Sequence, residues 1–166
     1  MKLSFTSPFE REPGVVAWLL KQSYAELVAS EPEHWELELE NWEQSDRNVF
    51  ENPHTVGACT FLSWANMDLA GFFCFDPRPR PTYGVIGHNC ILPQFRGQGF
   101  GNQQIIEILR RFRETGIKQA KVSTNDHPFF VSAQRMYAAC GFREVRRVAG
   151  NRDPRQNLIH YEREIE

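Results

Sequence analysis

The sequence contains no apolar run long enough to cross a membrane and no strong excess of either charge. No stretch approaches the roughly 20 apolar residues that a spanning helix needs, and the start, Met1 to Phe5, lacks the apolar core of a signal peptide. The net charge is −2, whereas a dedicated nucleic-acid or membrane-surface binder usually has a strong basic excess. We therefore expect a soluble cytoplasmic protein with no nucleic-acid or membrane partner.

Cysteines are few and are not spaced as metal ligands. Cys59, Cys74, Cys90 and Cys140 lie far apart, and the sequence contains no CxxC or Cys/His ligand spacing. A zinc site is therefore not expected, and no metal ligand is assigned. The simplest interpretation is that the four residues are buried free thiols in a reducing compartment.

Length, composition and periodicity indicate a globular α+β protein. The 166 residues, of which 41% are hydrophobic and 24% charged, suit one domain over residues 1–166. The expected order is strand, two helices, three strands, helix, strand, helix, two strands. Hairpin links predict antiparallel strand pairs, and a helix between two strands predicts one parallel pair. The expected fold is a mixed, mostly antiparallel sheet with helices on both faces.

The periodicity and the turn signals set the boundaries of these elements. Strands are expected at Leu3–Phe9, Thr55–Trp64, Leu69–Phe75, Thr82–Leu92, Lys118–Thr124, after Phe142, and at Leu158–Ile165. Helices are expected at Gly14–Ala29, Glu33–Phe50, Gln98–Thr115 and Pro128–Cys140.

Glycines at positions 97, 99 and 101 alternate at the start of the expected third helix. The first N–H groups of a helix are unpaired and carry partial positive charge, so a phosphate binds there readily. The spacing differs from the dinucleotide fingerprint, and a P-loop is excluded because Asn102 rather than Lys follows Gly101. A phosphate-binding loop is the leading interpretation, and a plain turn between strand and helix is the alternative.

Two motifs resemble the GCN5-related N-acetyltransferases. The run Arg96 to Gly101 looks like that family's R/Q-x-x-G-x-G/A motif, which holds the pyrophosphate of CoA. Ile91-Leu92-Pro93 resembles the end of the family's fourth strand, and Ala133 to Phe142 resembles its A-x-x-x-Y-x-x-x-G-F motif. The close resemblance covers Val85 to Phe142 and implies the acyl-CoA N-acyltransferase (GNAT) fold with acetyl-CoA as cosubstrate.

The resemblance also implies roles for individual residues. The backbone of Asn89, Cys90 and Ile91 would pair with the pantetheine arm, and an N–H near Ile91 would polarise the thioester carbonyl. Tyr137 would protonate the departing thiolate, although a buried aromatic residue of the core is the alternative interpretation of its position. The loop would bind the pyrophosphate through Arg96, Gly97, Gln98, Gly99, Phe100, Gly101 and Asn102, with the backbone contributing most and Arg96 adding charge.

Two positions depart from the family pattern or leave the chemistry open. Phe130 stands where many members have an asparagine that contacts the cofactor, and Asn125 is the expected substitute. An acceptor amine with a pKa of about 10.4 costs roughly 4–5 kcal/mol to deprotonate at pH 7, so a general base is expected. His88 is the first candidate, provided that its face of the strand meets the acceptor; His127 is the second, and ordering a helix start is the alternative role for it.

The resemblance also implies that the segment of sequence between the first and second strands shapes the acceptor groove. Six glutamates between positions 31 and 43, together with Tyr24, Trp35 and Trp42, would suit a cationic amine. The alternative is a solvated acidic helix with its tryptophans in the core.

The expected function is transfer of the acetyl group of acetyl-CoA to a primary amine of a small molecule or peptide by direct attack. A non-catalytic acyl-CoA-binding sensor or interaction module is the alternative, and a homodimer is left open.

Overall fold

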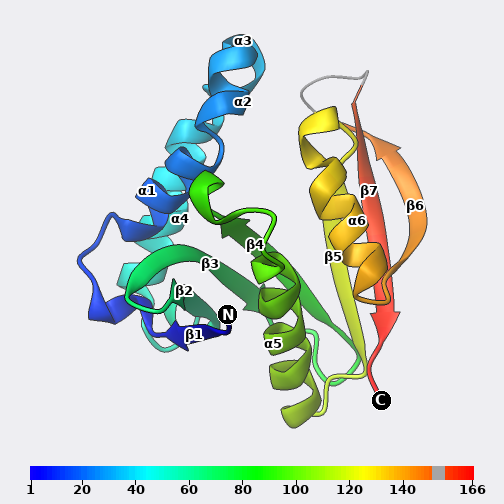
Figure 1. The fold of residues 1–166 in the computed structure, drawn as a ribbon. Helices are drawn as coiled ribbons and strands as arrows, with labels where there is room; N and C mark the ends of the chain where they lie inside the picture. Colours follow the sequence, from blue (N-terminus) through cyan, green and yellow to red (C-terminus); the bar gives the residue numbers. More distant parts are fainter. Residues whose placement is uncertain (151–155) are drawn as a thin grey trace. The chain divides into compact units, whose positions relative to one another are not determined.

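The computed structural model describes residues 1–150 and 156–166 (Figure 1). Its strands are β1 (Leu3–Thr6), β2 (Thr60–Ala65), β3 (Asp68–Asp76), β4 (Gly84–Ile91), β5 (Gln119–Asn125), β6 (Arg143–Ala149) and β7 (Asn157–Glu164). Its helices are α1 (Val15–Ser23), α2 (Ala25–Ser30), α3 (Pro32–Trp35), α4 (Glu38–Glu51), α5 (Phe100–Glu114) and α6 (Val131–Ala139). Short 3-10 turns lie at Pro8–Glu10, Gly57–Cys59, Pro93–Phe95 and Pro128–Phe130.

The strands form a seven-stranded sheet in the order β1-β2-β3-β4-β5-β7-β6. The pairs β1–β2, β2–β3, β5–β7 and β6–β7 are antiparallel, whereas β4–β5 is parallel and is connected through α5. This confirms the predicted mixed, mostly antiparallel α+β fold. The chain divides into two compact units, residues 1–74 with 88–104 and residues 75–87 with 105–166, called here the first and the second unit. The interpretation of residues 1–166 as one domain stays a prediction.

The first unit has apolar clusters on opposite faces of its strands. One cluster joins Leu19 and Leu20 of α1 and Trp42 of α4 to Phe72 and Cys90. The other joins the start of α5 to the strands, and its buried members are Leu3, Ala65, Ala70 and Phe100. Antiparallel pairing shifts by one residue between Ser63 and Trp64, where Ala70 is the extra residue of β3. This bulge explains why Ala70 and Phe72 lie in different clusters despite an even spacing.

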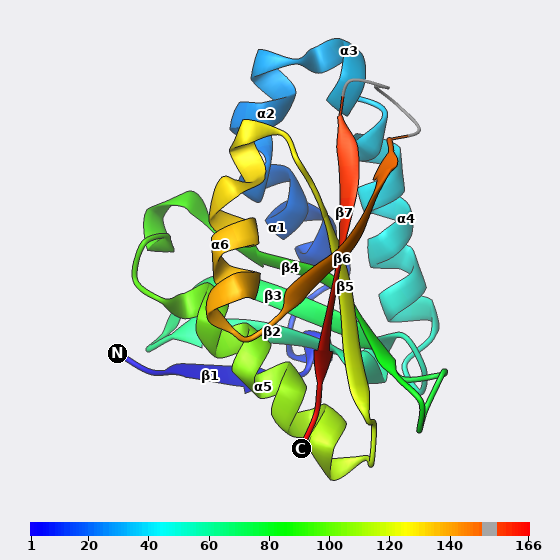
Figure 2. The same cartoon turned by 90° about the vertical axis from the view of Figure 1, so that its right-hand side faces the viewer.

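The second unit packs α6 against its own strands (Figures 1 and 2). Tyr137 of α6 contacts Tyr161 of β7, with ring centroids 5.6 Å apart. In the same unit, a Cβ built on Gly84 would lie 2.6 Å from the ring of Phe112, so a residue with a side chain would displace that buried ring. Along α5, Ile108 is fully buried, whereas Ile106 is 60% exposed and lies outside the buried stripe of the helix.

Two predicted helices are each divided in the structure. The helix expected at Gly14–Ala29 is interrupted at Tyr24, which ends α1 and begins α2 with a non-helical φ of −113° and ψ of 11°. The helix expected at Glu33–Phe50 is divided into α3 and α4. Helical periodicity runs through both breaks. At the first break one residue is non-helical, and at the second Glu36 and Leu37 keep right-handed helical dihedral angles, so the spacing of the apolar side chains hardly changes.

Two predicted strands are too long. The strand expected at Leu3–Phe9 ends at Thr6, because the Ser7 hydroxyl accepts a hydrogen bond from the Phe9 N–H and begins a 3-10 turn. The strand expected at Thr55–Trp64 begins only at Thr60. A 3-10 turn precedes it, and Gly57 packs so closely there that a Cβ would lie 2.6 Å from the Val49 carbonyl oxygen.

The start of α1 depends on a buried carboxylate from α4. Asp46 accepts hydrogen bonds from the N–H groups of Gly14 (2.9 Å), Val16 (2.9 Å) and Ala17 (3.1 Å). These donors have no partner within the helix, so the side chain satisfies groups that would otherwise be buried unpaired.

We predict that Asp46→Ala lowers the free energy of unfolding by about 2–3 kcal/mol, because it leaves buried N–H groups without an acceptor. Urea denaturation followed by circular dichroism measures this loss. Glu40→Ala, at an exposed position of the same helix, is the control and should change stability by less than about 0.5 kcal/mol. Equal stability of the Asp46 and Glu40 variants would contradict the capping role.

Candidate active site

The glycine loop has a conformation that requires glycine at two positions. The 3-10 turn Pro93–Phe95 leads into it, and α5 begins at Phe100. Gly97 has φ of +76° and Gly99 has φ of +78°, in the left-handed region that side-chain-bearing residues avoid. A Cβ built on either glycine would meet no atom within 4 Å. Backbone conformation therefore demands the glycines, and the surface above them is open to a ligand.

The backbone N–H groups of residues 97–102 are available as donors. None of them donates a hydrogen bond to any part of the chain that the structure describes. The first bond of α5 runs from the Gln103 N–H to the Gly99 carbonyl oxygen, at 3.3 Å. A row of unpaired N–H groups at the positive end of a fifteen-residue helix suits a diphosphate. The loop predicted from the sequence therefore has the donors that a phosphate needs, and its binding of the CoA pyrophosphate stays a prediction.

Arg96 anchors the loop through its side chain. Its Nη2 donates to the carbonyl oxygen of Ser23, the last residue of α1, at 2.5 Å. Its Nε donates to the carbonyl oxygen of Ile91, the last residue of β4, at 3.1 Å. The guanidinium thus ties the loop to the helix before it and to the strand that leads into it. A contribution of its charge to pyrophosphate binding stays a prediction.

The second half of β4 presents its residues to two faces of the first unit. Cys90 belongs to the cluster under α1 and α4, whereas Ile91 packs with Phe100 in the cluster under α5. His88 lies on the Cys90 face, since its ring lies 6.3 Å from that of Phe72, which belongs to the same cluster. His88 and Cys90 therefore share one face of β4, the face that α1 and α4 cover.

Desolvation shifts the pKa values of these β4 side chains. The His88 side chain reaches solvent, yet the atoms around it displace water from the imidazole, and this lowers the pKa of His88 below its ordinary value. The ring is therefore neutral at pH 7 and can accept a proton. Burial raises the pKa of the Cys90 thiol to about 11, so Cys90 remains protonated.

Tyr137 lies in the second unit and is 3% exposed. Its ring packs at an angle against Phe142, with centroids 5.9 Å apart, and against Tyr161. Burial also raises the pKa of the Tyr161 hydroxyl. This packing holds the Tyr137 ring firmly, and its role as the proton donor stays a prediction.

The residues after β5 order the turn into α6. The Asn125 side-chain oxygen accepts a hydrogen bond from the His127 N–H at 2.7 Å, and the Asn125 carbonyl oxygen accepts one from Gln134 at 3.2 Å. His127 Nδ1 accepts a hydrogen bond from the Phe129 N–H at 3.0 Å. His127 therefore orders the turn, as its alternative interpretation states. Cofactor contact by Asn125 stays a prediction, and Phe130 packs edge-on against Phe129.

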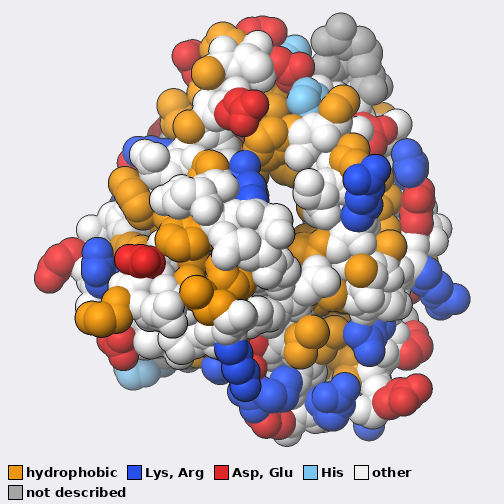
Figure 3. Space-filling view, viewed as in Figure 1, with side chains coloured by type: hydrophobic (Ala, Val, Ile, Leu, Met, Phe, Trp, Pro, Cys, Tyr) orange, Lys and Arg blue, Asp and Glu red, His pale blue; other side chains and the backbone are white. Residues whose placement is uncertain are grey.

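The acidic segment combines a buried side with a charged surface. Trp42 is buried and stacks on Tyr24, with ring centroids 5.5 Å apart, so this tryptophan belongs to the core. Trp35 donates a hydrogen bond to Glu31 at 3.3 Å, and Lys21 forms an ion pair with Glu43. Acidic side chains gather over α2 and α3 in Figure 3. The alternative interpretation of Trp42 is confirmed, and the acidic surface remains available to a cation.

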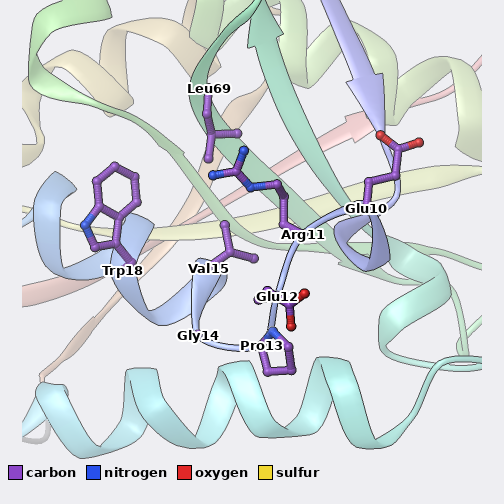
Figure 4. A pocket seen from close by; sticks show the side chains of 8 residues that line it. All are labelled: Glu10, Arg11, Glu12, Pro13, Gly14, Val15, Trp18 and Leu69. Atoms are coloured by element: carbon purple, nitrogen blue, oxygen red, sulfur yellow. The ribbon is translucent and has the colours of Figure 1, made fainter.

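A pocket of about 480 Å³ opens elsewhere on the first unit (Figure 4). Its walls are residues 10–15, Trp18 of α1 and Leu69 of β3, so the glycine loop contributes nothing to it. The Arg11 guanidinium extends between Leu69 and Trp18, and it lies 5.7 Å from the ring of Trp64. The charged residues of the lining are exposed and solvated, so the pocket has no buried polar group aimed at a ligand.

Comparison with known families decides the relationship of this chain. The acetyltransferase (GNAT) family model matches residues 18–142, well over half of the sequence. The chain belongs to the acetyltransferase (GNAT) family. The matched region includes the glycine loop and the segment around Tyr137, so both motifs that suggested the resemblance lie within it. A search of curated protein sequences gives no match.

Solved structures of GNAT acetyltransferases share the fold at low sequence identity. One from Desulfovibrio desulfuricans is 16% identical with a TM-score of 0.77, over 99% of each chain. A Bacillus subtilis acetyltransferase in complex with CoA is 14% identical with a TM-score of 0.64, again over 99% of each chain. One from Elizabethkingia anophelis with acetyl-CoA bound is 16% identical with a TM-score of 0.53, over 63% of this chain and 74% of that one.

The structure describes residues 1–150 and 156–166, which have neither a candidate metal cluster nor a helix that could span a membrane. Those residues contain no group of three or more His, Cys, Asp or Glu side chains that could hold a metal ion. None of the helices described is both long and apolar enough to cross a membrane.

We predict that Gly99→Ala weakens CoA binding roughly tenfold or more, because alanine disfavours the left-handed conformation that aims the loop N–H groups. Isothermal titration with CoA measures the effect. Gly116→Ala is a matched control, since Gly116 also has a positive φ of +75° and open space around its Cβ but follows the far end of α5. Both variants should lose about 1–2 kcal/mol of stability, and an equal loss of CoA affinity would contradict the assignment.

Proposed function

We propose that this protein transfers the acetyl group of acetyl-CoA to a primary amine of a small molecule or peptide by direct attack. The observation that carries the proposal is the set of unpaired N–H groups of residues 97–102 at the start of α5. The GNAT family match supports it, as do neighbours of the same fold that bind CoA or acetyl-CoA. In the proposed complex, the loop holds the pyrophosphate and Asn89 to Ile91 pair with the pantetheine arm.

The chemistry of Cys90 favours direct attack over an acyl-enzyme. A thiol with a pKa of about 11 is ionised in only about one molecule in ten thousand at pH 7. Because the thiolate is the nucleophile, Cys90 is a poor acceptor of an acetyl group. In this proposal the amine nitrogen therefore attacks the thioester carbon itself, the C–S bond breaks, and an amide forms.

Two side chains carry the protons in this proposal. His88 accepts the proton that the amine must lose, because its lowered pKa keeps the imidazole neutral at pH 7. Tyr137 donates a proton to the departing thiolate of CoA. The N–H of Ile91 stabilises the negative charge that develops on the thioester oxygen.

The acceptor in this proposal is a cationic amine that approaches over the face of the first unit on which His88 lies. The acidic surface of α2 and α3 supports this choice, because carboxylates raise the local concentration of a cation. Residues 1–166 would act as one GNAT domain in the cytoplasm, with no membrane or nucleic-acid partner, in line with the net charge of −2. An acyl-CoA-binding module without catalysis is the alternative, and an acceptor screen that follows release of the CoA thiol separates the two.

We predict that Tyr137→Phe lowers kcat by roughly 10²–10⁴, because the thiolate then leaves without a proton donor. Release of the CoA thiol at saturating substrates measures kcat. Tyr161→Phe is the control, since Tyr161 is also buried and contacts Tyr137. An unchanged kcat for Tyr137→Phe, with intact CoA binding, would show that Tyr137 only packs.

We predict that the acid limb of the pH profile of kcat/KM depends on His88. With an acceptor amine that stays neutral across the range, activity should be full above the lowered pKa of His88 and fall as the pH drops through it, because protonation removes the base. The midpoint should lie below 6.5, the ordinary histidine value. His88→Gln should reduce the rate and remove this limb, and a limb that persists in His88→Gln would rule out His88 as the base.

A further inference from the structure

Gln104 forms a buried hydrogen-bonded junction beneath the glycine loop. It lies on α5 one turn after the loop and is 1% exposed. Its Nε2 donates to Ser63 Oγ at 2.9 Å, to the Phe72 carbonyl oxygen at 3.2 Å and to the Cys90 carbonyl oxygen at 3.2 Å. A single amide group therefore joins α5 to β2, β3 and β4.

This amide lies at a buried position of α5 where an apolar side chain would pack without needing hydrogen-bond partners. Gln104 is on the buried stripe of α5, beside Ile105 and one turn before Ile108. Burying an amide is costly unless its hydrogen bonds are made, and here two N–H bonds are shared among three acceptors. The contacts link strands at the β2–β3 bulge, where Ala70 has no opposite residue and the strand ladder is interrupted.

The contact with Cys90 fixes the direction of one peptide group. The Cys90 carbonyl oxygen faces β3, since a Cβ built on Gly71 would lie 2.0 Å from it. In a planar trans peptide the C=O and the following N–H point in opposite directions, so the Ile91 N–H points away from β3. The Leu92 N–H agrees with this, because it donates to the Ala70 carbonyl oxygen of β3 at 2.8 Å and successive N–H groups alternate along a strand.

We infer that Gln104 is a positioning residue that holds the Cys90–Ile91 peptide so that the Ile91 N–H faces the thioester. This inference rests on the proposed function, in which that N–H stabilises the developing oxyanion. Gln104 belongs to the same helix whose first N–H groups would bind the pyrophosphate. Its side chain therefore links the two contacts with acetyl-CoA, one through the loop and one through β4, at a fixed relative geometry.

A positioning role predicts different catalytic effects for a substitution at Gln104 and for one at Ser63, which accepts one of the Gln104 hydrogen bonds. Gln104→Met keeps a side chain of similar length but removes both donors, which frees the Cys90 carbonyl. Ser63→Ala removes one acceptor of the same amide and leaves the contacts with Phe72 and Cys90 in place. A purely structural junction would make the two variants alike in catalysis once each is folded, whereas a positioning role separates them.

The experiment compares both variants with the unaltered protein in three measurements. We expect Gln104→Met to lower kcat at saturating substrates about 10–100-fold, because the oxyanion donor is displaced rather than removed. It should weaken binding of acetyl-CoA more than binding of CoA, since only acetyl-CoA has the thioester carbonyl. It should also shift the Ile91 amide resonance in NMR spectra without ligand. Ser63→Ala should keep kcat within about threefold.

The outcomes that overturn the inference are distinct from those that overturn the proposed function. Equal kcat and equal acetyl-CoA to CoA affinity ratios in the two folded variants, with an unmoved Ile91 amide, would refute the positioning role. Failure of the unaltered protein to bind CoA or acetyl-CoA would instead refute the proposed function, and the Ile91 resonance would still report whether Gln104 orients the peptide. If Gln104→Met does not fold, Gln104→Asn, whose amide is one methylene shorter, takes its place in each comparison.

Discussion

The unpaired N–H groups at the first turn of α5 are the constraint around which the first unit is organised. A helix start can bind an anion only if its donors are held at fixed positions and kept from other acceptors. Left-handed glycines turn these donors outward, and Arg96 fastens the loop to α1 and β4. The Gln103 side-chain oxygen accepts a hydrogen bond from the Leu3 N–H at 2.8 Å, and this contact fastens the same turn to β1. The loop is therefore held by polar contacts from Arg96 and Gln103 to α1, β4 and β1.

Those contacts give the Arg96 side chain and the loop backbone different roles. The sequence motif draws attention to Arg96, because a cation beside a phosphate is an obvious interpretation. In the structure two of its nitrogens donate to carbonyl oxygens of the protein itself. In the proposed complex, anion binding therefore falls mainly to the backbone N–H groups of residues 97–102, which donate to no other acceptor in the described chain. A loop that binds a ligand through backbone N–H groups depends on its conformation more than on its side chains. For ligand affinity, its glycines therefore matter more than its charge.

The sequence predicts the parts of this protein that local patterns encode. The glycine loop and the order of the strands are such patterns, since both depend on neighbours in sequence. The break at Tyr24 and the late start of β2 are not, because tertiary contacts such as that of Gly57 with Val49 decide them. Gln104 could have been noticed as a polar residue on an apolar stripe. Its partners could not, because Ser63, Phe72 and Cys90 come together only when the strands pair around a bulge.

A sequence motif can assign only part of the chemistry at the second half of β4. Alternation predicts which side chains share a face, and it places His88 with Cys90, but it says nothing of which peptide N–H is aimed at a substrate. That direction depends on how each carbonyl is held, and at Cys90 it is held by a glutamine from a helix and by the absence of a side chain at Gly71. An oxyanion donor supplied by a backbone N–H is therefore specified by residues distant from it in the sequence. The direction of this N–H is set by contacts in the core, so a buried amide in the core can affect catalysis.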